Sequence, residues 1–105
     1  MCGLVGLASS SPQIEYDWLP IARDALTHRG PDDAGVWWSE DLRVGFGHRR
    51  LSVLELSPLG HQPMQRPELG LSIVFNGEIY NFTEIRRELE QLGHTFHSHS
   101  DTEVL

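Results

Sequence analysis

Residues 35–48 of the chain are GVWWSEDLRVGFGH, two runs rich in aromatic, β-branched and glycine residues on either side of the polar pair Glu40-Asp41. This pattern predicts two strands, over residues 35–39 and 42–48, that are joined at the polar pair. Because so short a connection can only join antiparallel neighbours, the stretch predicts an antiparallel sheet.

Three further stretches extend this prediction along the chain. The apolar residues 2–8 predict a buried strand. Residues 71–75 predict a strand that ends at Asn76-Gly77, and this pair predicts a second hairpin because both central residues of the commonest tight turn need positive φ. Residues 58–67 are rich in Pro, Gly and Gln, so a loop is expected there.

Two segments have the apolar spacing of amphipathic helices, residues 17–27 and 82–92. For the second, Asn81 and Glu84 have the spacing of a capping box, and Gly93 is placed to end the helix. Hairpins combined with helices predict the α+β class, with the helices packed outside antiparallel sheets.

The composition is typical of a folded globular domain and argues against several classes of partner. Of the 105 residues, 39% are hydrophobic and 22% are charged. The formal net charge is −7 and there is no basic run, so we expect neither nucleic acid nor a membrane surface as a partner. A single cysteine cannot form an internal disulfide, and no apolar run has the length of a membrane span. A cytoplasmic location is therefore expected.

The only cysteine is the second residue of the chain, which begins Met1-Cys2-Gly3. Because a small second residue favours removal of the initiator methionine, we expect Cys2 to become the N-terminal residue. It would then carry a thiol and a free α-amine, whose reference pKa of about 7.7–8.0 lets it accept the thiol proton near neutral pH. By position alone, a small buried residue at the start of a strand is the favoured interpretation.

Other residues carry the groups that a thiol nucleophile and its substrate would need. Asn76 and Gly77 offer a carboxamide and a backbone N–H that can stabilise an oxyanion. Arg49 and Arg50 can bind a carboxylate, and Asp101 can bind an ammonium group. The simpler interpretations of these residues are a hairpin turn, a solvated strand end and a helix N-cap.

Metal and nucleotide binding have little support in the sequence. His94, His97 and His99 lie close together, but their spacing matches no structural zinc pattern, and a surface hairpin or strand is the preferred interpretation of that segment. Gly3 and Gly6 lack the residues that follow in a phosphate-binding or dinucleotide-binding loop. We therefore expect no metal and no cofactor in this segment.

Six short motifs recur here in the order in which one enzyme family has them. They are Cys2-Gly3-Leu4-Val5-Gly6, His28-Arg29-Gly30-Pro31-Asp32, Gly47-His48-Arg49-Arg50-Leu51-Ser52, Gly60-His61-Gln62-Pro63-Met64, Phe75-Asn76-Gly77-Glu78-Ile79-Tyr80-Asn81 and Ser100-Asp101-Thr102-Glu103-Val104. Together they resemble the glutaminase domain of class II glutamine amidotransferases, whose nucleophile is N-terminal. Pro31-Asp32 and Leu51-Ser52 resemble the branch of the glutamine-hydrolysing asparagine synthetases. Glu55 departs mildly from this branch, which often has an aspartate there.

The resemblance implies a role for each matching residue. Cys2 would be the nucleophile, and Asn76 and Gly77 would form the oxyanion hole. The residues implied to bind the substrate glutamine are Arg50 at its α-carboxylate, Glu78 and Asp101 at its α-ammonium group, and the backbone around Leu51 and Val53. The implied fold is the four-layer αββα sandwich of N-terminal-nucleophile hydrolases, of which residues 2–105 would form the N-terminal portion.

The implied activity is hydrolysis of glutamine through a cysteinyl thioester. In this family the ammonia passes to a C-terminal synthetase domain, which uses ATP and Mg²⁺ to amidate aspartate to asparagine. The alternatives are a relative that amidates another carboxylate, such as a sugar acid, and an inactive fragment. Residues 101–105 resemble the beginning of a helix, so we expect the chain to be part of a longer polypeptide. A homodimer is left open.

Overall fold

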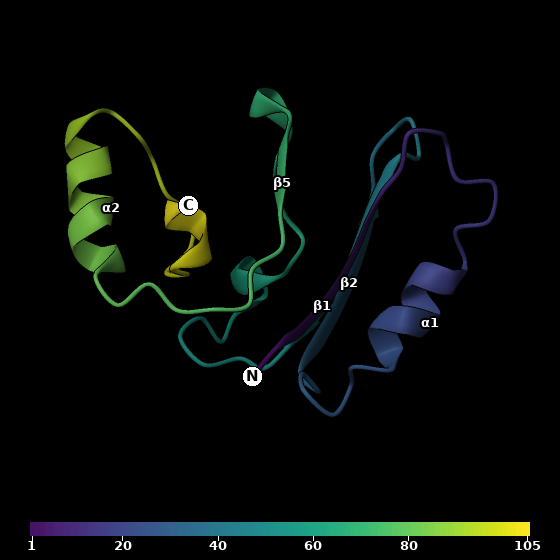
Figure 1. The fold of residues 1–105 in the computed structure, drawn as a ribbon. Coiled ribbons are helices and arrows are strands. Elements are labelled where there is room, and N and C mark those ends of the chain that lie inside the picture. The colour runs from purple at the N-terminus through teal and green to yellow at the C-terminus, as the bar shows by residue number, and fades with distance from the viewer.

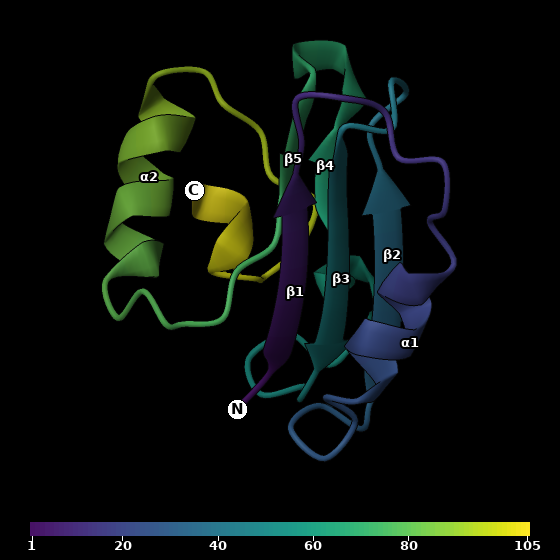
Figure 2. The same ribbon diagram turned by 45° about the vertical axis from the view of Figure 1, so that its right-hand side comes forward.

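The computed structural model describes residues 1–105 and contains two antiparallel sheets (Figure 1). The first sheet has the order β1 (Gly3–Ala8), β3 (Val44–Arg50) and β2 (Asp33–Trp38), which lie side by side in Figure 2. The second sheet is formed by β4 (Met64–Arg66) and β5 (Leu71–Ile73). Together with two helices, these sheets confirm the predicted α+β class, although only the first helix packs on a sheet; the second contacts the C-terminal turn Thr102–Val104.

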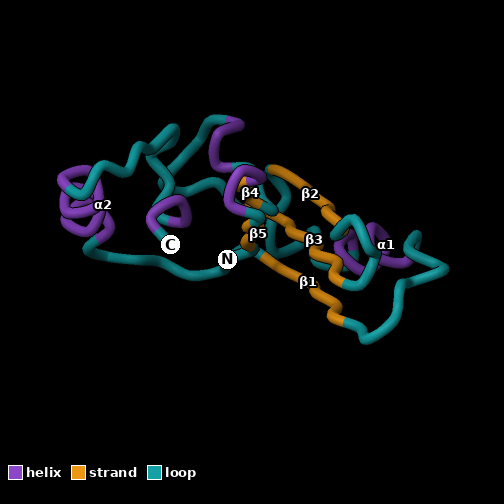
Figure 3. Tube along the Cα trace, turned by 90° about the horizontal axis from the view of Figure 1, so that it is seen from above, coloured by secondary structure: helices purple, strands orange, loops and turns teal.

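The elements are stacked in the order α1 (Trp18–Asp24), first sheet, second sheet and α2 (Phe82–Gln91), as Figures 1 and 3 both show. Helix α1 contacts all three strands of the first sheet. It can lie this close because Gly47 in β3 has no side chain: a Cβ atom there would be 3.1 Å from the Cβ atom of Arg23. The two sheets therefore lie between the two helices.

The hairpin predicted from residues 35–48 is confirmed, with both strands shifted by about two residues. Strands β2 and β3 pair antiparallel, with Val36 opposite Gly47. The connection is turned by Leu42, which has a φ of 56°, and it is stabilised by the Ser39 hydroxyl, which accepts a hydrogen bond from the N–H of Val44 (2.9 Å).

The helix predicted over residues 82–92 is also confirmed, and it ends just before Gly93, as predicted. Gly93 has a φ of 96°, and the following N–H of His94 donates to the carbonyl oxygen of Leu89 (3.0 Å). This is the usual way in which glycine satisfies the last carbonyl groups of a helix. The predicted capping box is wrong, because the side chain of Asn81 makes no capping hydrogen bond.

The hairpin predicted at Asn76-Gly77 is wrong. Strand β5 instead pairs with β4, which precedes it and lies in the segment 58–67 that was expected to be a loop. The two strands are connected through residues 67–70, where Gly70 has a φ of 65°. Neither Asn76 nor Gly77 has a positive φ, so they cannot form the expected turn.

The reason for this difference lies in side chains that replace a partner strand. The N–H of Phe75 donates to the Oε1 atom of Gln62 (2.6 Å), and the carbonyl oxygen of Phe75 lies 3.4 Å from Nε2 of His48. The amide of Asn76 donates to the carbonyl oxygen of Cys2 (3.0 Å). These polar groups are therefore satisfied by residues distant in sequence, and no second strand is needed.

Among the 16 buried residues, polar and charged side chains outnumber hydrophobic ones. Only two hydrophobic side chains, Leu19 in α1 and Val104 near the C-terminus, are buried. The buried polar residues are His48, Arg50, Gln62, Ser98, Ser100, Asp101 and Thr102. No fully buried side-chain nitrogen or oxygen atom lacks a hydrogen-bond partner. Helix α1 ends at Asp24, earlier than predicted. Neither helix has the length and apolar character of a membrane-spanning segment.

Candidate active site

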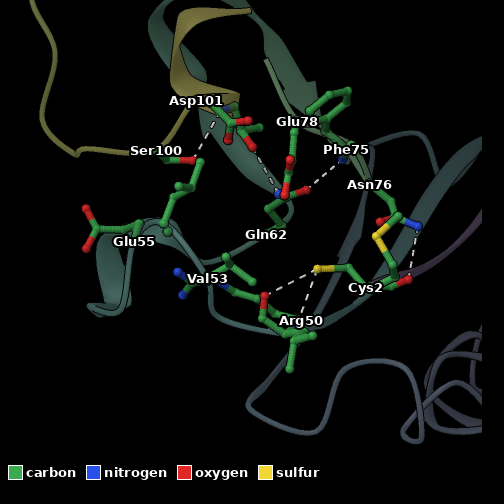
Figure 4. A pocket seen from close by; sticks show the side chains of 16 residues that line it. Cys2, Arg50, Val53, Glu55, Gln62, Phe75, Asn76, Glu78, Ser100 and Asp101 are labelled. Carbon is green, nitrogen blue, oxygen red and sulfur yellow. Dashed lines mark hydrogen bonds between the residues drawn. The ribbon is translucent and has the colours of Figure 1, made fainter. Parts of the chain in front are cut away.

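An open pocket lies where β1 begins and β3 ends (Figure 4). Its volume of about 180 Å³ is below the several hundred Å³ typical for drug-sized ligands, so it suits a small metabolite. The lining includes all the residues to which the family resemblance assigned a role, namely Cys2, Arg50, Leu51, Val53, Asn76, Gly77, Glu78 and Asp101. The fold thus brings together residues from four separate segments of the chain.

The thiol of Cys2 is half-buried and lies against the backbone of Leu51. Its Sγ atom accepts a hydrogen bond from the N–H of Leu51 (3.3 Å) and lies 3.6 Å from the carbonyl oxygen of the same residue. The backbone of Leu51 therefore fixes the position of the thiol. The carbonyl oxygen of Cys2 is held by Asn76 and by Nε of Arg29, both at 3.0 Å.

The backbone nitrogen of Cys2 is in a peptide bond with Met1 in the described chain. The free α-amine expected from the sequence can exist only after Met1 has been removed. Met1 is 69% exposed and lines the pocket, so its removal would uncover the amine at the site itself.

Asn76 lies beside Cys2 (Figure 4). A carboxamide nitrogen carries two hydrogens, and the bond to the Cys2 carbonyl oxygen uses only one of them. Gly77 follows at the rim and is exposed. The pair can therefore offer N–H groups to a ligand atom in front of the Cys2 thiol.

The two adjacent arginines have different environments, and only Arg50 lines the pocket. It is 7% exposed, and its Nη1 atom donates to the carbonyl oxygen of Ser57 (3.0 Å). Gly60 makes room for the guanidinium, since a Cβ atom there would be 2.2 Å from Nη2. Arg49 instead donates to the carbonyl oxygen of Gly30 (2.9 Å). A buried guanidinium with unused donors is suited to a carboxylate.

The acidic residues that line the pocket are Asp101, Glu78 and Glu55, and sequence analysis assigned a substrate role to the first two. One carboxylate oxygen of Asp101, Oδ2, accepts a hydrogen bond from the N–H of Ile79 (2.9 Å), and no protein group donates to the other oxygen. Asp101 is 7% exposed, whereas Glu78 is exposed. The pocket therefore contains a guanidinium and carboxylates, the groups that match the two charges of an α-amino acid.

Sequence reasoning assigned no role to three residues that support this pocket: His48, Gln62 and Glu55. His48 is 1% exposed, and burial lowers its pKa below the ordinary value, so its ring is neutral at pH 7. Both His48 and Gln62 lie within the family-like motifs, but their partners at Phe75 are known only from the fold. No local pattern indicates such long-range contacts.

Glu55 joins two loops that carry pocket residues. Its carboxylate accepts hydrogen bonds from the N–H of Ser57 (3.0 Å), after Arg50, and from the N–H of His99 (2.8 Å), shortly before Asp101. The hydrogen bonds from Ser57, followed by that from His99, lower the pKa of Glu55 to about 2. Glu55 thus holds together the two loops that carry Arg50 and Asp101.

We predict that Glu55→Gln flattens the acid dependence of stability. Because the folded-state pKa is depressed, the ionised Glu55 contributes stability above its unfolded pKa of about 4.5. That contribution is lost as the pH falls toward the folded value of about 2. Urea unfolding between pH 2 and 6 should show a shallower decline for Glu55→Gln than for the wild type. Glu84→Gln, at an exposed position of α2, should follow the wild type, and identical curves for all three would refute the assignment.

The side chains of the histidine-rich segment are not gathered into a cluster of possible metal ligands. No group of three or more His, Cys, Asp or Glu side chains is arranged to hold a metal ion. The segment 93–100 is irregular, so the hairpin or strand expected there is wrong. The N–H of His97 donates to Glu103 and that of His99 to Glu55, where a strand would have used a neighbouring backbone.

The chain belongs to the glutamine amidotransferase domain family, which it matches over residues 1–105. It is 42% identical over 109 residues to asparagine synthetase (glutamine-hydrolyzing) 1 of Bacillus subtilis (strain 168), and 41% identical to asparagine synthetase (glutamine-hydrolyzing) 3 of the same organism. It is also 39% identical over 116 residues to Amidase chry2 of Gibberella zeae. The resemblance inferred from the six motifs is confirmed.

Each of these alignments covers the whole chain but only 17% of the relative. The relatives are therefore several times longer than the 105 residues described here. No solved structure gives a significant match.

Proposed function

We propose that this chain is the glutamine-hydrolysing part of an asparagine synthetase and that it releases ammonia from glutamine at Cys2. The observation that supports this most strongly is the composition of the pocket. A thiol, a buried guanidinium and the carboxylates of Asp101 and Glu78 line one cavity, although they come from distant segments. Glutamine has an electrophilic amide carbon, a carboxylate and an ammonium group, and each has a counterpart there.

The proposed reaction begins after removal of Met1. The α-amine of Cys2 takes the thiol proton, and the thiolate attacks the side-chain amide carbon of glutamine. Asn76 and Gly77 stabilise the oxyanion that develops on the amide oxygen. The C–N bond then breaks, and the amine returns the proton to the departing ammonia. Water cleaves the resulting thioester, which yields glutamate and restores the thiol.

The proposed substrate contacts follow from the charges in the pocket. Arg50 binds the α-carboxylate, because its guanidinium is buried and retains free N–H donors. Asp101 and Glu78 bind the α-ammonium group, which is supported by the unpaired oxygen of Asp101. Backbone groups around Leu51 and Val53 complete the glutamine site.

The ammonia would be used by a C-terminal synthetase domain on the same polypeptide, and the names and lengths of the relatives support this. Aspartate is the proposed acceptor. ATP and Mg²⁺ would be held by that further domain, since these 105 residues contain no phosphate-binding loop. The alternative acceptor is another carboxylate, and one relative of similar identity is named as an amidase rather than as an asparagine synthetase.

We further propose that residues 2–105 are the N-terminal portion of a four-layer αββα sandwich of the N-terminal-nucleophile hydrolases. The stacking order of α1, two sheets and α2 supports this fold (Figure 3). Large side chains such as Leu71 (60% exposed) and Leu105 (67% exposed) also remain uncovered, as expected where further layers of the domain would pack.

Substrate analogues test this function directly. L-Glutamine should release ammonia, whereas glutaramic acid lacks the α-ammonium group and 4-aminobutanamide lacks the α-carboxylate. Each analogue leaves a charged pocket residue without its partner, so we expect kcat/KM to fall about 10²-fold or more. The measurement is the rate of ammonia release in a coupled enzyme assay, carried out on the protein as its gene encodes it. Equal rates for all three amides, or no ammonia from glutamine, would contradict the proposed function.

A further inference from the structure

Gln62 connects two sides of the pocket through both ends of its side-chain amide. Its Oε1 atom accepts a hydrogen bond from the N–H of Phe75 (2.6 Å), and its Nε2 atom donates to Oγ1 of Thr102 (3.3 Å). Figure 4 shows the Gln62 side chain between Phe75 and the segment of Asp101. Phe75 precedes Asn76, and Thr102 follows Asp101, so the bridge joins the neighbours of two proposed site residues.

The bridge is buried and its orientation is determined. Gln62 is 7% exposed and Thr102 is 3% exposed, so water does not readily replace either bond. A backbone N–H can only donate, and the group that faces Phe75 must therefore be the amide oxygen. The amide nitrogen then points to the hydroxyl of Thr102. The backbone of Gln62 is fixed as well, since it passes so close to Gly35 that a Cβ atom there would be 1.9 Å from the Gln62 carbonyl oxygen.

His48 holds the carbonyl side of the same residue, Phe75. Its Nε2 atom lies 3.4 Å from the carbonyl oxygen of Phe75, and because a carbonyl only accepts, Nε2 carries the hydrogen. The peptide that leads into Asn76 is thus anchored by His48, and the preceding N–H is anchored by Gln62. Asn76 has no strand partner, so its backbone is held through Phe75 by these two side chains, while its own amide is bonded to the carbonyl oxygen of Cys2.

We propose that Gln62 is a positioning residue that keeps the oxyanion-binding Asn76 and the ammonium-binding Asp101 at a fixed separation. This inference rests on the proposed glutaminase function. Gln62 acts through Phe75 on Asn76 and through Thr102 on Asp101. Loss of the first bond displaces the oxyanion donor and lowers kcat, whereas loss of the second displaces the ammonium site and raises KM.

Three variants separate the two ends of the bridge. Gln62→Met has a similar length but removes both bonds, and we expect kcat to fall about tenfold to a hundredfold together with a raised KM, as displacement of a reacting group by about 1 Å does. Thr102→Val removes only the bond on the Asp101 side, so KM should rise several-fold with little change in kcat. Thr102→Ser keeps the hydroxyl and should behave as the wild type.

The readout is steady-state glutamine hydrolysis by the protein as its gene encodes it, together with the rate at which iodoacetamide alkylates Cys2. Alkylation needs neither Asn76 nor Asp101, so an unchanged rate shows that the thiol is intact in each variant. If Gln62→Met fails to fold, the Val and Ser variants of Thr102 still test the bridge. Values of kcat and KM that stay within about twofold of the wild type in Gln62→Met and Thr102→Val would overturn the inference. A wild-type protein without glutamine turnover would instead reject the proposed function.

Discussion

Cys2→Ala is expected to abolish ammonia release from glutamine, with a loss of more than about 10³-fold that leaves only the background rate. The proposed reaction has no other nucleophile, because Cys2 is the only cysteine and it provides both the thiol and the base. The methyl group of alanine cannot form the thioester. The measurement is ammonia or glutamate formed at saturating glutamine.

Two features make this variant informative. Alanine is also small, so removal of Met1 should proceed as in the wild type, and the α-amine is retained. The hydrogen bonds to the Cys2 carbonyl oxygen come from Asn76 and Arg29 and involve the backbone, so they do not depend on the side chain. We expect the stability to change little. Substantial turnover by Cys2→Ala would show that another group is the nucleophile.

Arg50→Met is expected to raise the KM for glutamine about 10²-fold, with a smaller effect on kcat. The change removes a charge-assisted pair with the substrate carboxylate, and hydrogen bonds to charged groups contribute about 1.5–3 kcal/mol each. The guanidinium also donates to the carbonyl oxygen of Ser57, so some loss of stability should accompany the change. Glutamine saturation curves and urea unfolding measure the two effects separately.

Arg49→Met is the matched control for this prediction. Arg49 is the preceding residue, and its guanidinium contacts Gly30 and Asp24 rather than the pocket. We expect reduced stability but an unchanged KM. If both variants raised KM to the same extent, Arg50 would have no specific role in glutamine binding.

Local signals in the sequence were sufficient for some elements of the fold. Helix α2 was predicted because its apolar spacing and Gly93 both act within a few residues. The β2–β3 hairpin was predicted for the same reason, since its strands are adjacent in the chain. The Asn76-Gly77 pair gave an equally strong local signal, yet the turn is absent because the polar groups of Phe75 bind Gln62 and His48.

The same distinction applies to the site. Motif order was sufficient to select eight of the 16 residues that line the pocket, and the structure brings these eight together. It could not indicate the residues that hold them in place, because those contacts join distant positions. Glu55 binds the backbone of His99, and Gln62 binds Thr102. Supporting contacts of this kind become visible only once the fold is known.

The most direct test of the central claim is the intact mass of the protein after incubation with a glutamine-mimicking electrophile. We predict a protein that lacks Met1 and carries a single adduct, together with no adduct on Cys2→Ala. Such a result would mean that an N-terminal cysteine recognises glutamine and reacts with it. Retention of Met1, or a wild-type protein that remains unmodified, would contradict the account.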